Sequence, residues 1–118
     1  MNEIELVQGD ASSIFKFQRK DAEGNVINTL PQKMWITFKL HPGSEKSLFQ
    51  KTLESGIKYS EEDNYYRFQI MSEDTKDAPY GVYGFDIAIL NEVGEKKTLF
   101  NNGVLKIVEH YTHKQDEV

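Results

Sequence analysis

The feature that most constrains this chain is an alternation of apolar and polar residues with a period of two. It runs through four segments that are rich in aromatic and β-branched residues, namely 14–18, 35–40, 65–70 and 83–89. Successive side chains on a strand point to opposite faces, so each segment has one apolar and one mostly polar face. The pattern predicts four strands packed on one side, with Ile36, Phe38 and Leu40 sharing an apolar face.

Weaker β-type segments and turn sequences fill the intervals. The weaker segments are 4–7, 26–30, 57–60, 97–100 and 104–108, the last with Leu105 and Ile107 facing the core. The turn sequences are 21–25, 41–44, 61–64, 91–94 and 101–103. Asn and Gly supply the positive φ that tight hairpins need, and Asn102-Gly103 is the strongest hairpin signal. Many short strands at close, even spacing predict an all-β sandwich or barrel.

Two further segments have local signals of their own. Residues 44–56 carry apolar side chains at helical spacing and Gly56 at a C-cap position, but the same residues also fit a period of two. We favour a strand, because a lone helix fits a sandwich poorly, and keep the helix as the alternative. Residues 72–76 offer Ser and Asp side chains as caps and predict one helical turn.

Length and charge exclude several classes of protein. The 118 residues suit one domain, and fourteen basic against nineteen acidic residues leave a net charge of −5. That balance disfavours a nucleic-acid partner, which requires a basic surplus or stripe. There is no cysteine, which excludes disulfides and thiol chemistry. The first ten residues lack an export signal, and the longest aliphatic run is residues 87–90, so we expect synthesis in the cytosol and no membrane partner.

Residues able to carry catalysis or bind metal are scattered. His110 and His113 lie near the chain end without a third ligand, and His41 lies in a turn. No serine has a nucleophile motif, and residues 61–63 form a charge run typical of a solvated loop. Residues 21–25 faintly resemble a calcium loop, but residues 91–95 repeat their shape, which favours two similar hairpin turns. We therefore expect no enzyme, no metal site and no cofactor.

Three aromatic residues are candidate surface contacts. Trp35, Tyr59 and Tyr65 are the aromatic residues that do not follow the inward positions of their segments. Trp35 opposes Ile36 and Phe38 in parity, so it lies at an interface or both faces of its strand are covered. Exposed aromatics of this kind mark protein contacts or sugar stacking.

A corner motif narrows the sandwich type. In immunoglobulin domains a tyrosine near the start of strand F precedes the buried inter-sheet position by two and bonds back across the corner. Tyr83 precedes Phe85 by two, Gly81 precedes Tyr83 by two, and Asp74-Thr75 resembles the turn that leads into strand F. Phe85 stands where antibody domains have cysteine. The chain resembles an immunoglobulin-like antiparallel β-sandwich of about seven to nine strands, with residues 1–111 as the domain and 112–118 as a flexible tail.

A closer resemblance spans roughly residues 4–108. The matching segments, in order, are 8–10, 15–17, 21–26, 36–38, 73–75, 81–87, 98–99 and 103–107. Together they resemble the immunoglobulin-like domain at the N-terminus of tailed-phage baseplate upper proteins, and its small freestanding relatives in prophages of Gram-positive bacteria. The resemblance implies a non-enzymatic virion component that docks onto other tail or baseplate proteins, or onto copies of itself. The alternative is a carbohydrate-binding module that attaches a virion to cell-wall glycan, which needs two or more coplanar exposed aromatics.

Overall fold

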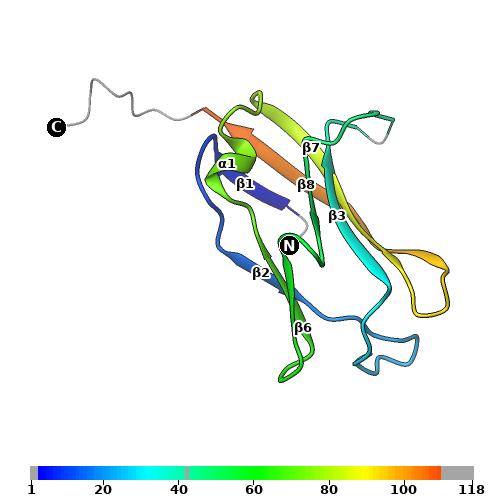
Figure 1. The fold of residues 1–118 in the computed structure, drawn as a ribbon. Coiled ribbons are helices and arrows are strands. Elements are labelled where there is room, and N and C mark those ends of the chain that lie inside the picture. Colours follow the sequence, from blue (N-terminus) through cyan, green and yellow to red (C-terminus); the bar gives the residue numbers. More distant parts are fainter. Residues whose placement is uncertain (1–2, 42, 110–118) are drawn as a thin grey trace.

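The chain folds into strands with a single helical turn (Figure 1). The computed structural model describes residues 3–41 and 43–109. In that part the elements, in chain order, are β1 (Glu3–Val7), β2 (Ile14–Phe17), β3 (Lys33–Lys39), β4 (Phe49–Thr52), β5 (Ile57–Ser60), β6 (Tyr65–Gln69), α1 (Ser72–Thr75), β7 (Gly81–Leu90) and β8 (Lys96–Val108). The predicted all-β class is confirmed, and the described residues contain no helix long and apolar enough to cross a membrane.

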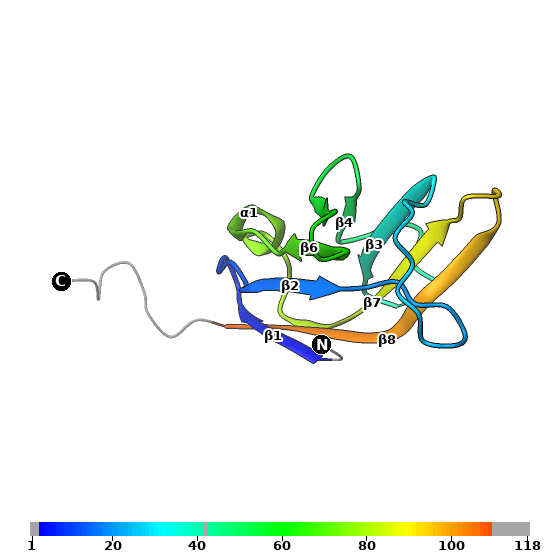
Figure 2. The ribbon, with the colours of Figure 1, turned by 90° about the horizontal axis from the view of Figure 1, so that it is seen from below.

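The strands form two sheets that share one core. The larger sheet has the order β1-β8-β7-β3-β4 and the smaller β2-β6-β5. β1 pairs with β8 in parallel, whereas the other pairs are antiparallel, so the larger sheet is mixed and the prediction of a wholly antiparallel sandwich is wrong at this edge. Figure 2, a view along the layers, shows β2 and β6 lying over the sheet that contains β1 and β8. The arrangement is sandwich-like, as expected when each sheet has one apolar face to bury.

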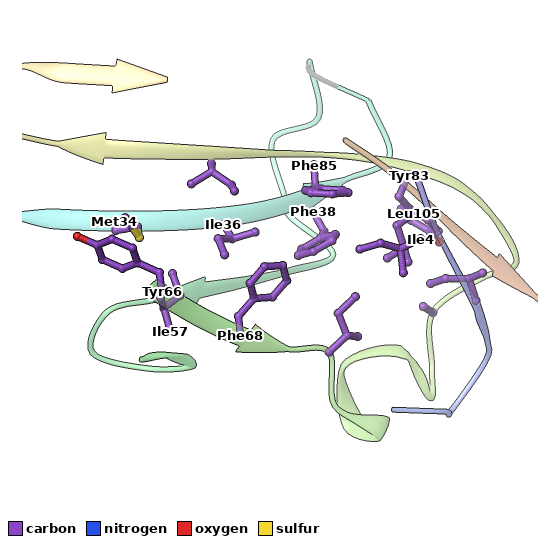
Figure 3. Close-up of a cluster of buried hydrophobic side chains, with 14 of the residues drawn as sticks. Ile4, Met34, Ile36, Phe38, Ile57, Tyr66, Phe68, Tyr83, Phe85 and Leu105 are labelled. Carbon is purple, nitrogen blue, oxygen red and sulfur yellow. The ribbon is translucent and has the colours of Figure 1, made fainter. Parts of the chain in front are cut away.

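The core confirms most of the predicted alternation. Ile36 and Phe38 from β3, Phe68 from β6 and Leu105 from β8 are buried (Figure 3). Ile107 of β8 is buried as well. Three stacked or tilted ring pairs link four strands of the larger sheet, namely Phe38–Phe49, Phe38–Phe85 and Phe85–Phe100.

Leu40 departs from the prediction for its segment. The period of two placed it on the buried face with Ile36 and Phe38, yet it is 60 % exposed. β3 ends at Lys39, so Leu40 lies beyond the last paired position and alternation no longer fixes its direction.

The ambiguous segment 44–56 and the helical turn at 72–76 both form as predicted. Residues 44–56 contain the strand β4 and no helix. Residues 72–76 contain α1, where the Asp74 carboxylate accepts a hydrogen bond from the Met71 amide at 2.8 Å. Lys51 of β4 lies 2.6 Å from the same carboxylate, and both side chains are largely buried. This ion pair joins β4 to the helical turn.

The weak strand predicted for 26–30 does not form. That segment contributes only an isolated bridge between Val26 and Lys20 before the chain crosses to β3. The buried Arg19 side chain binds it instead, with Nη1 donating to Thr29 O at 3.0 Å and to Glu92 Oε1 at 2.9 Å. A crossing between sheets has no neighbouring strand to pair with, so β propensity alone leaves it irregular.

The hairpin predicted at Asn102-Gly103 is also wrong. β8 is one continuous strand through these residues, and neither residue has the positive φ that the predicted turn requires. Phe85 pairs with Gly103 but Ile87 pairs with Phe100, so β8 carries an extra residue there. This bulge puts Gly103 and Phe100 on the same face although three positions separate them.

Gly103 is required for steric reasons. A Cβ at this position would lie 2.4 Å from two atoms of the Phe85 ring. The ring has little freedom to move, because Phe38 and Phe100 pack against it with centroids at 4.8 and 5.7 Å. The residue that predicted a turn is instead the point where an aromatic ring lies against the backbone.

The prediction of two similar turns at 21–25 and 91–95 is confirmed. In the first, Asp21 Oδ1 accepts from the amides of Glu23 and Asn25. In the second, the side-chain oxygen of Asn91 accepts from the equivalent two amides, and both turns have a glycine with positive φ at the fourth position. Backbone hydrogen bonds lower the pKa of Asp21. An Asx turn explains the shared shape.

Substituting Gly103→Ala is expected to destabilise the fold by about 1–3 kcal/mol, because the new methyl group overpacks the Phe85 ring. Urea unfolding monitored by circular dichroism measures the change. Gly84→Ala is the matched control, since a Cβ there meets nothing closer than 3.9 Å. Equal stability of the two variants would contradict the steric role of Gly103.

Candidate functional site

A groove lies on the outer face of the larger sheet, opposite the core. It has a volume of about 530 Å³ and is lined by residues from β3, β4, β7, β8 and the loop after β3. Its floor is shallow along β7, where Gly84 and Ala88 alternate with Asp86. Because Phe85 and Ile87 fill the core from the same strand, these alternate positions face outward. Small side chains on a central strand leave the hollow.

Trp35 is the aromatic residue on the wall of this groove. In the pairing register it lies between Thr52 of β4 and Ala88 of β7, and Ala88 in turn pairs with Thr98 of β8. The Trp35 side chain is half-buried. Among the described residues, the aromatic and cation–π pairs involve other rings only. Both cross-strand neighbours of the indole are therefore small, and no aromatic or cation–π contact to it is formed by residues 3–41 and 43–109.

Several hydrogen-bonding groups line the same groove as Trp35. Gln50 Nε2 donates to Thr37 Oγ1 at 2.8 Å, which fixes the amide at the rim. Thr37 pairs in register with Asp86, whose side chain is half-exposed. Asn101 lines the groove from β8. The site thus combines one apolar ring with several donors and acceptors.

The charges of the groove cancel. Lys39 and Lys96 contribute two positive charges, and Glu45 and Asp86 contribute two negative charges. None of these four takes part in the ion pairs formed within the described part of the chain. The groove is electrostatically neutral on a chain whose net charge is −5.

The three aromatic residues predicted as contacts do not come together. Tyr59 pairs with the buried Tyr66 on the inner face, their rings 4.7 Å apart, and its hydroxyl donates to Asn64 Oδ1 at 2.7 Å. Tyr65 alternates with Tyr66 and so lies on the outer face of the smaller sheet, under the Lys16 ammonium at 4.6 Å. Trp35, Tyr59 and Tyr65 therefore belong to three different surfaces, and the platform of several coplanar aromatics that the carbohydrate-binding alternative required does not form among them.

The residues predicted as a structural corner each form contacts near the entry into β7. Tyr83 is buried and its hydroxyl donates to Pro79 O at 2.7 Å, four residues upstream. Burial raises the pKa of this phenol. Thr75 of α1 is fully buried, and its hydroxyl accepts from the Gly9 amide at 3.1 Å. Gly81, at φ 152°, begins β7. These contacts, with Asp74 on Lys51, fix the entry into β7.

The other chemistry-bearing residues are dispersed. In residues 3–41 and 43–109 no three His, Asp or Glu side chains gather as a metal site. His110 and His113, and the tail predicted at 112–118, lie outside the described residues. In the charge run, Glu61 and Glu62 are exposed, whereas Asp63 binds Arg67 and the Tyr65 amide. The Arg67 guanidinium lowers the pKa of Asp63 to about 2.

Sequence reasoning missed most residues of the groove. Thr37, Lys39 and Asp86 were part of the polar faces of their segments, and Gln50 lay in an ambiguous segment. The available signal was the small-residue alternation at Gly84 and Ala88, which only has meaning once β7 is known to be central. Neighbouring strands here are distant in the chain, so no local pattern could align them.

Comparison with protein-family models and with curated proteins found no match.

Substituting Tyr83→Phe is expected to cost about 0.5–1.5 kcal/mol of stability, because it removes the hydroxyl that satisfies Pro79 O. Chemical unfolding measures the loss. Tyr80→Phe serves as the control, since Tyr80 is 51 % exposed. A corner bond without energetic weight would leave both variants at wild-type stability.

The Asp63–Arg67 pair is expected to contribute a pH-dependent part of the stability. The folded pKa of Asp63, about 2, lies below its ordinary value of 3.8, so the contribution is present above pH 3.8 and is lost as the pH falls toward 2. The melting temperature of Asp63→Asn should lie below wild type at pH 6, and the two should converge near pH 2. Glu62→Gln, an exposed neighbour, should follow wild type; a constant difference between Asp63→Asn and wild type at all pH values would refute the linkage.

Proposed function

We propose that this chain is an immunoglobulin-like β-sandwich that acts as a non-catalytic docking module in a phage or prophage tail or baseplate. Its partners would be other virion proteins, or further copies of itself. The order of the sequence motifs, the order of the strands and an exposed apolar surface support it.

The strand order supports the immunoglobulin-like assignment. In variable-type domains the sheet of strands G, F and C gains a further strand, C′, and strands B, E and D form the opposite sheet. The order β8-β7-β3-β4 corresponds to G-F-C-C′, and β2-β6-β5 corresponds to B-E-D. The bond from Tyr83 to Pro79 O corresponds to the tyrosine corner at the start of strand F. Phe85 then occupies the inter-sheet position of strand F.

An exposed apolar patch supports docking and is the observation that carries the functional part. Leu40, Tyr80 and Val82 are 60 %, 51 % and 56 % exposed. They lie at adjoining ends of β3 and β7, where Lys39 pairs with Gly84. Exposed large apolar side chains at neighbouring strand ends are typical of protein contacts, where their burial excludes water from an anchor. We name Leu40, Tyr80 and Val82 the end patch.

The phage assignment is tested on assembled particles. Antibodies raised against the chain are expected to label tails purified from the bacterial strain that encodes it, seen by immunogold electron microscopy. Purified tails that carry no label, although the chain is expressed in the same cells, would overturn the assignment.

The end patch is tested with matched charge substitutions. The double variant Leu40→Lys and Val82→Lys should reduce incorporation into particles by at least about tenfold, because lysine opposes burial of the anchor. Val93→Lys, at the opposite end of β7 and 77 % exposed, should incorporate normally. Circular dichroism confirms that the variants remain folded. Normal incorporation of the double variant would show that the end patch is not the contact.

A further inference from the structure

We propose that the groove on the outer face of the larger sheet binds one or two residues of an uncharged glycan. This is a function in addition to docking and does not depend on it. The site is centred on Trp35 and the floor of β7, and it needs neither Tyr59 nor Tyr65.

The half-buried indole of Trp35 provides an aromatic surface on the groove. A pyranose ring presents a patch of C–H groups that packs on an indole while its hydroxyls point outward. Trp35 offers such a surface, because Ala88 and Thr52 are its cross-strand neighbours and neither covers a ring. An amphipathic aromatic with one side wet is suited to this type of contact.

Polar side chains line the groove together with Trp35. A sugar hydroxyl both donates and accepts, so it needs acceptors and donors within one site. Asp86 supplies carboxylate oxygens, and Gln50 supplies an amide that its bond to Thr37 holds in place. Ligand sites commonly have this composition, an apolar surface with a few convergent polar groups.

The net charge and the volume of the groove both suit a neutral sugar. The two lysines and two carboxylates of the groove cancel, which provides no net attraction for a polyanion such as nucleic acid or a polyol phosphate. The volume of about 530 Å³ lies within the ~300–1,000 Å³ range of small-ligand sites and suits one or two hexose units. A neutral, hydroxyl-rich ligand with an apolar face fits both properties.

The floor of the groove, formed by β7, carries small residues. Gly84 and Ala88 leave the space above β7 open, and a Cβ on Gly84 meets only a backbone oxygen at 3.9 Å. A larger side chain at Ala88 would stand next to Trp35 and occupy the volume that the sugar needs. The groove therefore depends on small residues at these two positions.

The experiment uses Trp35 as its own reporter, since it is the only tryptophan of the chain. Screening on an array of neutral hexose and N-acetylhexosamine oligosaccharides selects a ligand. Titrating that oligosaccharide should change the tryptophan fluorescence with a Kd of about 1 mM or tighter. No saturable change and no array signal up to about 10 mM, a concentration well above the expected Kd, would overturn the proposal.

Variants localise the binding. Trp35→Ala on the array, and Ala88→Leu in the titration, should each weaken binding by at least about tenfold, a loss comparable to removing one stacking contact. Tyr65→Ala, on the outer face of the smaller sheet, is the matched aromatic control and should bind as wild type does. Thermal melts establish that each variant is folded. If Trp35→Ala does not fold, the titration of Ala88→Leu decides whether the sugar binds in the groove.

Two other results would also overturn the proposal. Wild-type binding by both groove variants would place the sugar elsewhere. Preference for a polyglycerol phosphate over every neutral glycan, with an affinity that falls as salt rises, would identify a polyanion site instead.

Discussion

The stacking of Phe38 on Phe85 is the contact on which the rest of this structure depends. It joins β3 to β7, and the outer members of the same group, Phe49 and Phe100, extend it to β4 and β8. With no cysteine in the chain, no covalent bond holds the sheets together, and burial of large aromatic surface must supply the stabilisation. Gly103 accommodates Phe85 by leaving its backbone bare, and the bulge beside it turns Phe100 inward. The Phe85 ring thus accounts for the glycine at position 103 and lies beside the bulge in β8, and its stack links β3, β4, β7 and β8.

The same strands determine the outer face. On β7 the odd positions Phe85 and Ile87 are held by the core, so Gly84, Asp86 and Ala88 are held outward at fixed spacing. A groove built on paired strands is more rigid than one built on loops, because each of its residues is positioned by backbone hydrogen bonds. This rigidity lowers the entropic cost of binding, which matters for a small ligand with few contacts.

The two proposed functions rely on different chemistry. The end patch is apolar and would lose water on contact with another protein, whereas the groove is polar, neutral and centred on one indole. Val82 lies two residues before Gly84 on β7, so the end patch adjoins one end of the groove. Under the two proposals, a virion protein docked on the end patch would leave the Trp35 part of the groove accessible, so that one module would bind a protein partner and a glycan together.

Local patterns were most informative where a residue's neighbours in space are its neighbours in sequence. The alternation through 83–89, the turn at 72–76 and the paired Asx turns were all predictable, because pleat direction and capping depend on residues a few positions apart. Leu40 and the segment 26–30 were mispredicted, since strand ends and crossings are decided by whether a partner strand is present. Asn102-Gly103 was mispredicted because Gly103 contacts the ring of Phe85, which lies on the neighbouring strand β7 and eighteen residues earlier in the chain. A contact over that distance in sequence leaves no local signal.

The sequence by itself determined an all-β chain and most of the residues of its core, because hydrophobic periodicity is a local property. Only the tertiary structure decided that β3, β4, β7 and β8 lie side by side, that Tyr59 and Tyr65 are separated from Trp35, and that Asp86 and Gln50 border one groove. The physical reason is that strand order follows from long-range packing of the two apolar faces, and a polar side chain gains its neighbours from that order and not from its place in the chain.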